Sequence, residues 1–173
     1  DKNVWLLNPQ SLSNLKARPQ GSPLPDLKSN IIKLIFSSNN KWIGALTAGN
    51  QIVIYNTVNR SGKTIPLKSR VQAFTFSADE KQLLTGDALG NLQTWDTITG
   101  NLLKTPIAKG NPITALAATT KLLAIGMGKE LHILDINTLN ELDQPTALGD
   151  IEQLIFSPDG SWLASTNSTG QIL

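Results

Sequence analysis

The chain has 173 residues, of which 15 are basic, 13 are acidic and none is cysteine. The lack of cysteine excludes disulfides, thiolate catalysis and cysteine-ligated zinc, and it favours a reducing compartment, so we expect an intracellular, cytoplasmic protein. A net charge of +2 does not give the concentrated basic footprint of a nucleic-acid-binding protein, so no specific nucleic-acid binding is expected. No stretch approaches the roughly 20 apolar residues of a membrane-spanning helix.

The first thirty residues predict one strand and one irregular segment. Residues 4–8 alternate and end in Leu7-Asn8, which is typical of a strand. Residues 15–27 are rich in proline, which cannot donate a hydrogen bond to a neighbouring strand. We therefore expect this stretch to be a loop or an irregular outer strand.

Four segments then begin with an apolar residue and roughly alternate. They open at Ile31, Val71, Ile113 and Ile151, so their starts are 40, 42 and 38 residues apart. Their period-2 pattern, with β-branched and aromatic residues, predicts strands. Three of them run into a turn that begins at Ser37, Ser77 or Ser157, and the third unit has Thr119-Thr120 instead, which predicts a tighter or irregular hairpin.

Each unit continues with further predicted strands. A second strand is expected to begin at Trp42, Gln82, Leu122 and Trp162, and glycine-rich loops follow at 48–50, 86–90, 126–128 and 167–170. The third strand ends in an apolar–polar pair, Tyr55-Asn56, Trp95-Asp96 or Leu134-Asp135. A looser fourth strand is expected at 64–67, 102–107 and 140–143.

A period near forty residues with four short strands in each repeat is typical of the blades of a β-propeller. The chain resembles the WD-repeat β-propellers through Phe-Ser-x-Asp/Asn at the first hairpin and through the sequence from Gly90 to Asp96. The predicted fold is therefore all-β, a WD-repeat β-propeller or propeller fragment of four-stranded antiparallel blades. Its units are residues 1–30 (partial), 31–70, 71–110, 111–150 and 151–173 (partial).

The chain departs from the family in one respect. WD-repeat blades often have a Gly-His pair before the first strand, and that His joins a Ser, the Trp and an Asp in a buried hydrogen-bonded network. The equivalent positions in this chain are residues 28–30, 68–70, 109–111 and 148–150, and none of them is His. We therefore expect the network to be absent and the blades to be held by apolar packing and backbone hydrogen bonds.

Both ends of the sequence are expected to lie within strands. One interpretation is a fragment of a larger propeller of six to eight blades. The other is ring closure, either within one chain, where the strands near the N-terminus complete the last of four blades, or by pairing two chains. An open array would leave free strand edges, which favours self-association.

A search for catalytic chemistry finds no supporting set of residues. His132 alternates with apolar neighbours in a strand and is expected to be structural. The glycine-rich sequences at 86–90 and 126–129 lie between strands rather than before a helix, so we expect hairpin turns and not phosphate-binding loops. The tryptophans recur in register and predict packing between blades. No enzyme activity, metal or cofactor is expected.

The function that the resemblance implies is a platform for protein–protein interaction. In the family, partners dock on loops before the first strand and between the second and third strands. Carried over by position, these are Asn30, Asn50, Arg70, Asp87, Leu89, Asn111, Lys129, Asp150 and Thr169. The partner is expected to be a protein or peptide. The alternative is a sensor or regulatory domain of a larger effector enzyme whose catalytic domain lies outside this segment.

Overall fold

The computed structural model describes residues 29–108, 110–145 and 149–167. Every regular element in these ranges is a β-strand, and the strands form antiparallel sheets. The strands expected at 4–8 and 171–173, and the proline-rich stretch between 15 and 27, lie outside the described residues.

Three blades have four strands each, paired in sequence order, and the fourth has two described strands. Blade 1 comprises β1 (Ile31–Phe36), β2 (Trp42–Thr47), β3 (Gln51–Asn56) and β4 (Ser61–Pro66). Blade 2 comprises β5 (Val71–Phe76), β6 (Gln82–Asp87), β7 (Asn91–Asp96) and β8 (Leu102–Ala108). Blade 3 comprises β9 (Ala115–Ala118), β10 (Leu122–Met127), β11 (Glu130–Asp135) and β12 (Glu141–Asp143). Blade 4 comprises β13 (Ile151–Phe156) and β14 (Leu163–Asn167).

The turns after the first strands form as their sequences predict. The hydroxyl oxygen of Ser37 accepts a hydrogen bond from the amide of Trp42 at 2.9 Å, and Ser77 and Ser157 do the same for the residues five positions later, at 3.0 Å. A shorter turn begins at Thr119, whose amide donates to the carbonyl of Leu122 at 2.8 Å. The expectation of a tighter hairpin in the third unit is confirmed.

Several strand boundaries differ from the sequence prediction. Gly86 and Met127 belong to strands rather than loops, β9 begins at Ala115 rather than Ile113, and β14 begins after Trp162. Gly86 stays in β6 because the absence of a side chain allows close packing: a Cβ built there would lie 2.2 Å from Cγ2 of Ile113. Glycine in a strand interior often marks such a close approach.

The core lies between the blades, in layers that we call seams. The front face of a blade is the side toward the preceding blade, and the back face is the side toward the following one. In the first seam the back face of blade 1, with Trp42 and Leu46, packs on Phe74, Phe76 and Trp95 of blade 2. Because both faces of an inner blade are covered, β6 is buried from Leu83 to Asp87.

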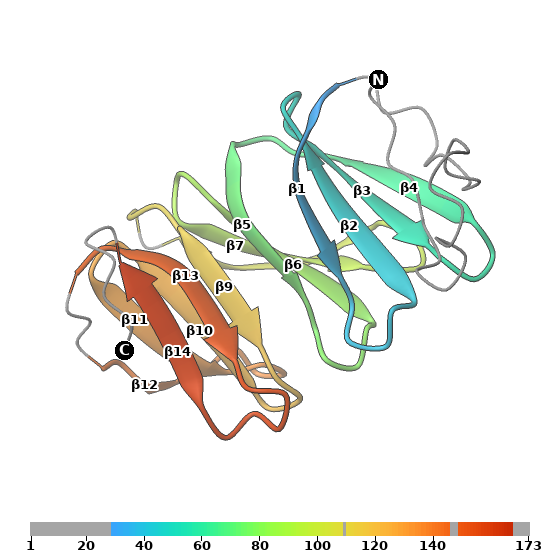
Figure 1. Ribbon diagram of the computed structural model, residues 1–173. Helices are drawn as coiled ribbons and strands as arrows, with labels where there is room; N and C mark the ends of the chain where they lie inside the picture. Colours follow the sequence, from blue (N-terminus) through green and yellow to red (C-terminus); the bar gives the residue numbers. More distant parts are fainter. Residues whose placement is uncertain (1–28, 109, 146–148, 168–173) are drawn as a thin grey trace, which may run out of the picture.

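The second seam follows the same plan. The back face of blade 2 contributes Ala73, Leu84 and Leu92, and the front face of blade 3 contributes Leu123 and Ile125. Figure 1 shows the blades side by side as an open arc, with blade 1 and blade 4 at its two ends. The described residues therefore form a repeated-blade fold, and they do not form a closed ring.

Candidate interaction surface

The loops that the sequence singled out lie together at one end of each blade. The amide of Ala48 donates to the carbonyl of Asn30 at 2.7 Å, and Ala88 donates in the same way to Arg70 at 2.9 Å. These bonds tie the segment before each first strand to the turn between the second and third strands. We call this surface the loop face. It consists of residues 29–30, 48–50, 68–70, 88–90, 110–113, 128–129 and 149–150.

Neighbouring blades are also joined at the loop face. The side-chain amide of Asn50 donates to the carbonyl of Ser69 at 2.8 Å, and its oxygen accepts from the amide of Val71 at 3.1 Å. Farther along, the amide of Ile113 donates to the carbonyl of Asp87 at 3.0 Å, and Ile151 donates to Gly128 at 2.7 Å. The backbone of the loop face is therefore held to the blades on both sides.

Asp87 organises the loop of blade 2. One carboxylate oxygen accepts from the amides of Leu89 and Asn91 at 2.9 and 2.8 Å, and the other accepts from the side chains of Asn91 and Ser69. Burial alone raises the pKa of the Asp87 carboxyl, but these hydrogen bonds outweigh burial and hold the pKa below its usual value. The side chain is only 2% exposed, so it shapes the loop from inside.

Six of the nine predicted site residues are exposed on the loop face. They are Asn30, Arg70, Leu89, Asn111, Lys129 and Asp150. Asn50 is half-buried and Asp87 is buried, and both are engaged in holding the backbone. Thr169 lies outside the described residues. The six exposed side chains are thus accessible from solvent, while Asn50 and Asp87 hold the backbone around blade 2.

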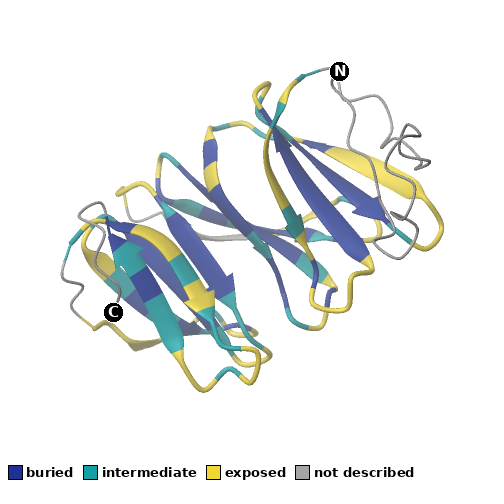
Figure 2. Cartoon of the chain, in the orientation of Figure 1, coloured by how far each residue is buried: buried dark blue, intermediate teal, exposed yellow. Residues whose placement is uncertain are grey.

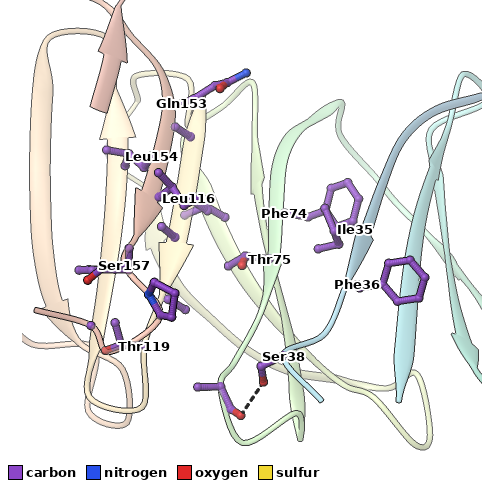
Figure 3. A pocket seen from close by; sticks show the side chains of 18 of the residues that line it. Ile35, Phe36, Ser38, Phe74, Thr75, Leu116, Thr119, Gln153, Leu154 and Ser157 are labelled. Atoms are coloured by element: carbon purple, nitrogen blue, oxygen red, sulfur yellow. Dashed lines mark hydrogen bonds between the residues drawn. The ribbon is translucent and has the colours of Figure 1, made fainter. Parts of the chain in front are cut away.

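A groove of about 710 Å³ lies on the inner side of the arc, away from the loop face. It is lined by the first strand of each blade and by the turns that follow these strands. Figure 3 shows polar Thr75, Gln153 and Ser157 among apolar Ile35 and Leu116. No sequence pattern pointed to this groove, because its lining comes from four segments about forty residues apart.

Two neighbouring turns meet at the edge of this groove. The hydroxyl of Ser38 donates to the carbonyl of Ala78 at 3.2 Å, which Figure 3 marks, and the amide of Asn39 donates to the carboxylate of Glu80 at 2.6 Å. The turn of blade 1 is therefore fixed to that of blade 2. The groove, like the loop face, is bounded by backbone that neighbouring blades hold in place.

His132, which the sequence predicts to be structural, is buried and hydrogen-bonded. It is 2% exposed, its Nδ1 is hydrogen-bonded to the carboxylate of Glu141, and its Nε2 lies 3.4 Å from the carboxylate of Glu130. Within the described part of the chain, no group of three or more His, Asp or Glu side chains is placed to bind a metal ion. The same residues include no helix long and apolar enough to cross a membrane.

The tryptophan prediction is confirmed for two residues and wrong for a third. Trp42 and Trp95 are buried in the first seam. Trp162 occupies the position equivalent to Trp42 and is 77% exposed. The difference arises because the back face of blade 1 is covered by blade 2, whereas no described strand covers the back face of blade 4.

No family model and no curated protein matches the chain. Among solved structures, the fold is widespread, with 1247 matching chains. One of them is the crystal structure of the computationally designed Ika4 protein, with a TM-score of 0.71 and 21% sequence identity. The match covers 87% of this chain and 92% of that chain. At this identity the similarity establishes the fold alone, an array of antiparallel β-blades.

Proposed function

We propose that the chain is a WD-repeat propeller unit that acts as a non-catalytic platform and binds a protein or peptide partner through its loop face. The observation that carries this proposal is the arrangement of the exposed loop residues. Arg70, Leu89, Lys129 and Asp150 project from one end of three successive blades, and backbone hydrogen bonds within and between blades hold that end. A rigid scaffold that presents varied side chains on loops is typical of binding surfaces.

Blade 2 supports the WD-repeat part of the proposal. The indole of Trp95 donates to the hydroxyl of Thr85 at 2.9 Å, and the hydroxyl of Ser69 donates to Asp87. Tryptophan, a hydroxyl residue and aspartate are three of the four members of the family's buried network. Ser69 lies in the segment where the family has its His. The expectation that the network is absent holds for the His, but these two hydrogen-bonded pairs are present in blade 2.

The chemistry of the exposed set favours a polypeptide partner. Two cations, one anion and the 62%-exposed side chain of Leu89 are spread over blades 2 to 4. Mixed charge with an apolar contact suits a protein or peptide surface, whereas a nucleic-acid site needs a concentrated cluster of Lys and Arg.

The test is a selection of random displayed peptides on the immobilised 173-residue chain. We expect the selected peptides to bind the double variant Arg70→Ser/Lys129→Ser at least tenfold more weakly, because both cations belong to the loop face. The matched control is Lys81→Ser/Lys121→Ser, which removes two exposed cations at the opposite end of the blades. Its affinities should stay within about twofold of the unaltered chain.

The side chain of Lys81 is 79% exposed and lies 3.7 Å from Asp79, so losing this pair should cost little stability. Unchanged affinity of the peptides for Arg70→Ser/Lys129→Ser would refute the loop face as the binding site. The same loss of affinity in both double variants would mean that binding depends on charge alone, and it would also refute the proposal.

A further inference from the structure

We propose that the two ends of the blade array bind each other between two copies of this chain. The back face of blade 4, at Trp162 and Ile155, would pack on the front face of blade 1, at Leu34 and Phe36, in a second copy. This contact is independent of the loop face and of the function proposed for it. The four side chains named here belong to described residues and are exposed.

The template for this contact is the seam between blades 1 and 2. There the back face of blade 1 presents Trp42 and the partly buried Ile35, and the front face of blade 2 receives them with Phe74 and Phe76. Figure 3 shows Ile35 beside Phe74, while Phe36 lies on the other side of β1. In this seam, Trp42 and Ile35 form a projecting pair on the back face of blade 1, and Phe74 and Phe76 form a receiving pair on the front face of blade 2.

The projecting pair recurs on the back face of blade 4, where both side chains are exposed. Trp162 and Ile155 follow Trp42 and Ile35 by 120 residues, in the same register. Trp42 is 7% exposed, whereas Trp162 is 77% exposed and Ile155 is 67% exposed. Large apolar side chains that gather on one exposed face mark an interaction site.

An apolar pair equivalent to the receiving pair lies on the front face of blade 1. Leu34 and Phe36 precede Phe74 and Phe76 by 40 residues, in the same register. Phe74 and Phe76 are 2% and 6% exposed, but Leu34 and Phe36 are 47% and 58% exposed.

The uncovered part of the front face is confined to β1. On the same face, β2 and β3 contribute a separate buried cluster of Ile43, Ala45, Val53 and Tyr55. In the template, β5 contributes Phe74 and Phe76, and β1 is the equivalent strand of blade 1.

A second copy is the occupant that these surfaces favour, because the exposed faces continue the series of seams already present in the chain. Within one chain the two faces lie at opposite ends of the arc, and their exposure shows that they do not cover each other (Figure 2). Joining a back face to a front face makes a heterologous contact, which closes into a ring if the rotation between copies allows it.

The first experiment is sedimentation velocity of the 173-residue chain over a range of concentrations. We expect a species heavier than the 18.6 kDa monomer. Trp162→Ser and Phe36→Ser should each weaken self-association at least tenfold. The control is Val58→Ser, since Val58 is also 77% exposed but lies in the turn between β3 and β4. A monomer at all concentrations, or an unchanged assembly in Trp162→Ser, would overturn the proposal.

A second experiment identifies which faces meet. The chain has no cysteine, so Ser161→Cys and Ser38→Cys, at exposed positions close to Trp162 and Phe36, each place a single thiol and leave the apolar side chains in place. A short bifunctional thiol reagent should join the two variants when they are mixed, and should join neither efficiently to itself. If the double variant instead cross-links within one chain at monomer mass on dilution, the faces close internally and the proposal is wrong.

Discussion

Asp87 shows how a single buried carboxylate can fix a loop of the proposed binding surface. Its two oxygens accept hydrogen bonds from Leu89, Asn91 and Ser69, and its backbone carbonyl accepts from Ile113 in the next blade. The amide of exposed Leu89 bonds to Asp87 directly, and exposed Arg70 is held nearby by the hydrogen bond from the amide of Ala88 to its carbonyl. The residue therefore acts on the loop face indirectly, by positioning its neighbours.

Asp87→Asn should lower the free energy of unfolding by about 1–3 kcal/mol, because an amide nitrogen replaces one of two accepting oxygens among buried donors. The measurement is urea unfolding at pH 7. Asp150→Asn is the control, since Asp150 is exposed on the same face and should change stability by less than about 0.5 kcal/mol. Equal effects of the two substitutions would contradict the role given to Asp87.

The same variant should also change the response to acid. Hydrogen bonds hold the folded-state pKa of Asp87 below its usual value, so its stabilising effect is present above the unfolded pKa of about 3.9. That effect is lost as the pH falls through the lower folded-state pKa. The stability difference between the unaltered chain and Asp87→Asn should therefore shrink below about pH 4, and a constant difference would contradict this account.

At two positions, the packing of a second strand against the start of the following unit depends on glycine. Gly86 of β6 and Gly126 of β10 hold equivalent positions, and each faces the first apolar residue of the following unit. A Cβ at Gly126 would lie 2.6 Å from Cγ2 of Ile151 and 3.2 Å from Cβ of Ala115. The seam between blades 3 and 4 thus requires a residue without a side chain at this point.

Gly126→Ala should destabilise the chain by about 1–3 kcal/mol, because the added methyl overpacks this seam. Thermal and urea unfolding measure the loss. Gly62→Ala on the exposed outer strand β4 is the control and should have little effect. In an Ile151→Ala background the cost of Gly126→Ala should fall, since the side chain it meets is shortened. Simple additivity of the two substitutions would argue against the contact.

The strands could be predicted from the sequence because each carries its own signal. Alternation placed β1 and β5, and the turns after Ser37 and Ser77 fixed where those strands end. The ends of β6 and β10 were misplaced because glycine has two meanings that sequence does not separate. It marks flexible turns, and it also marks a strand that passes close to another.

The position of the loop face could be predicted from the sequence, but the burial of the individual residues could not. The loop face follows from the repeat, since equivalent loops fall at the same end of every blade. Burial of Asp87 and exposure of Trp162 do not follow, because both depend on what the neighbouring blade supplies. A tryptophan in register with Trp42 indicates a seam, but only the structure shows that Trp162 is exposed and that no described strand covers it.

In the whole molecule, stability is distributed unevenly along the arc. Each seam contributes apolar burial only where two blades meet, so inner strands gain on both faces and outer strands gain little. β6 has buried residues that belong to both seams, with Leu83 in one and Leu84 in the other. In contrast, β12 is three residues long and fully exposed, and β4 has one buried residue, Ile65.

Amide hydrogen exchange should reveal this gradient. We expect the slowest exchange in β6 and β10, because opening them breaks a seam or the blade ladders on both sides. The fastest exchange among the strands should occur in β12, which pairs with β11 through only two registered positions, Ile133 with Asp143 and Leu134 with Glu141. Local openings of lower free energy are expected where few apolar contacts are lost. Uniform protection across all the blades would instead mean that the array opens as one cooperative unit, and it would remove the basis for treating the seams as separate contributions to stability.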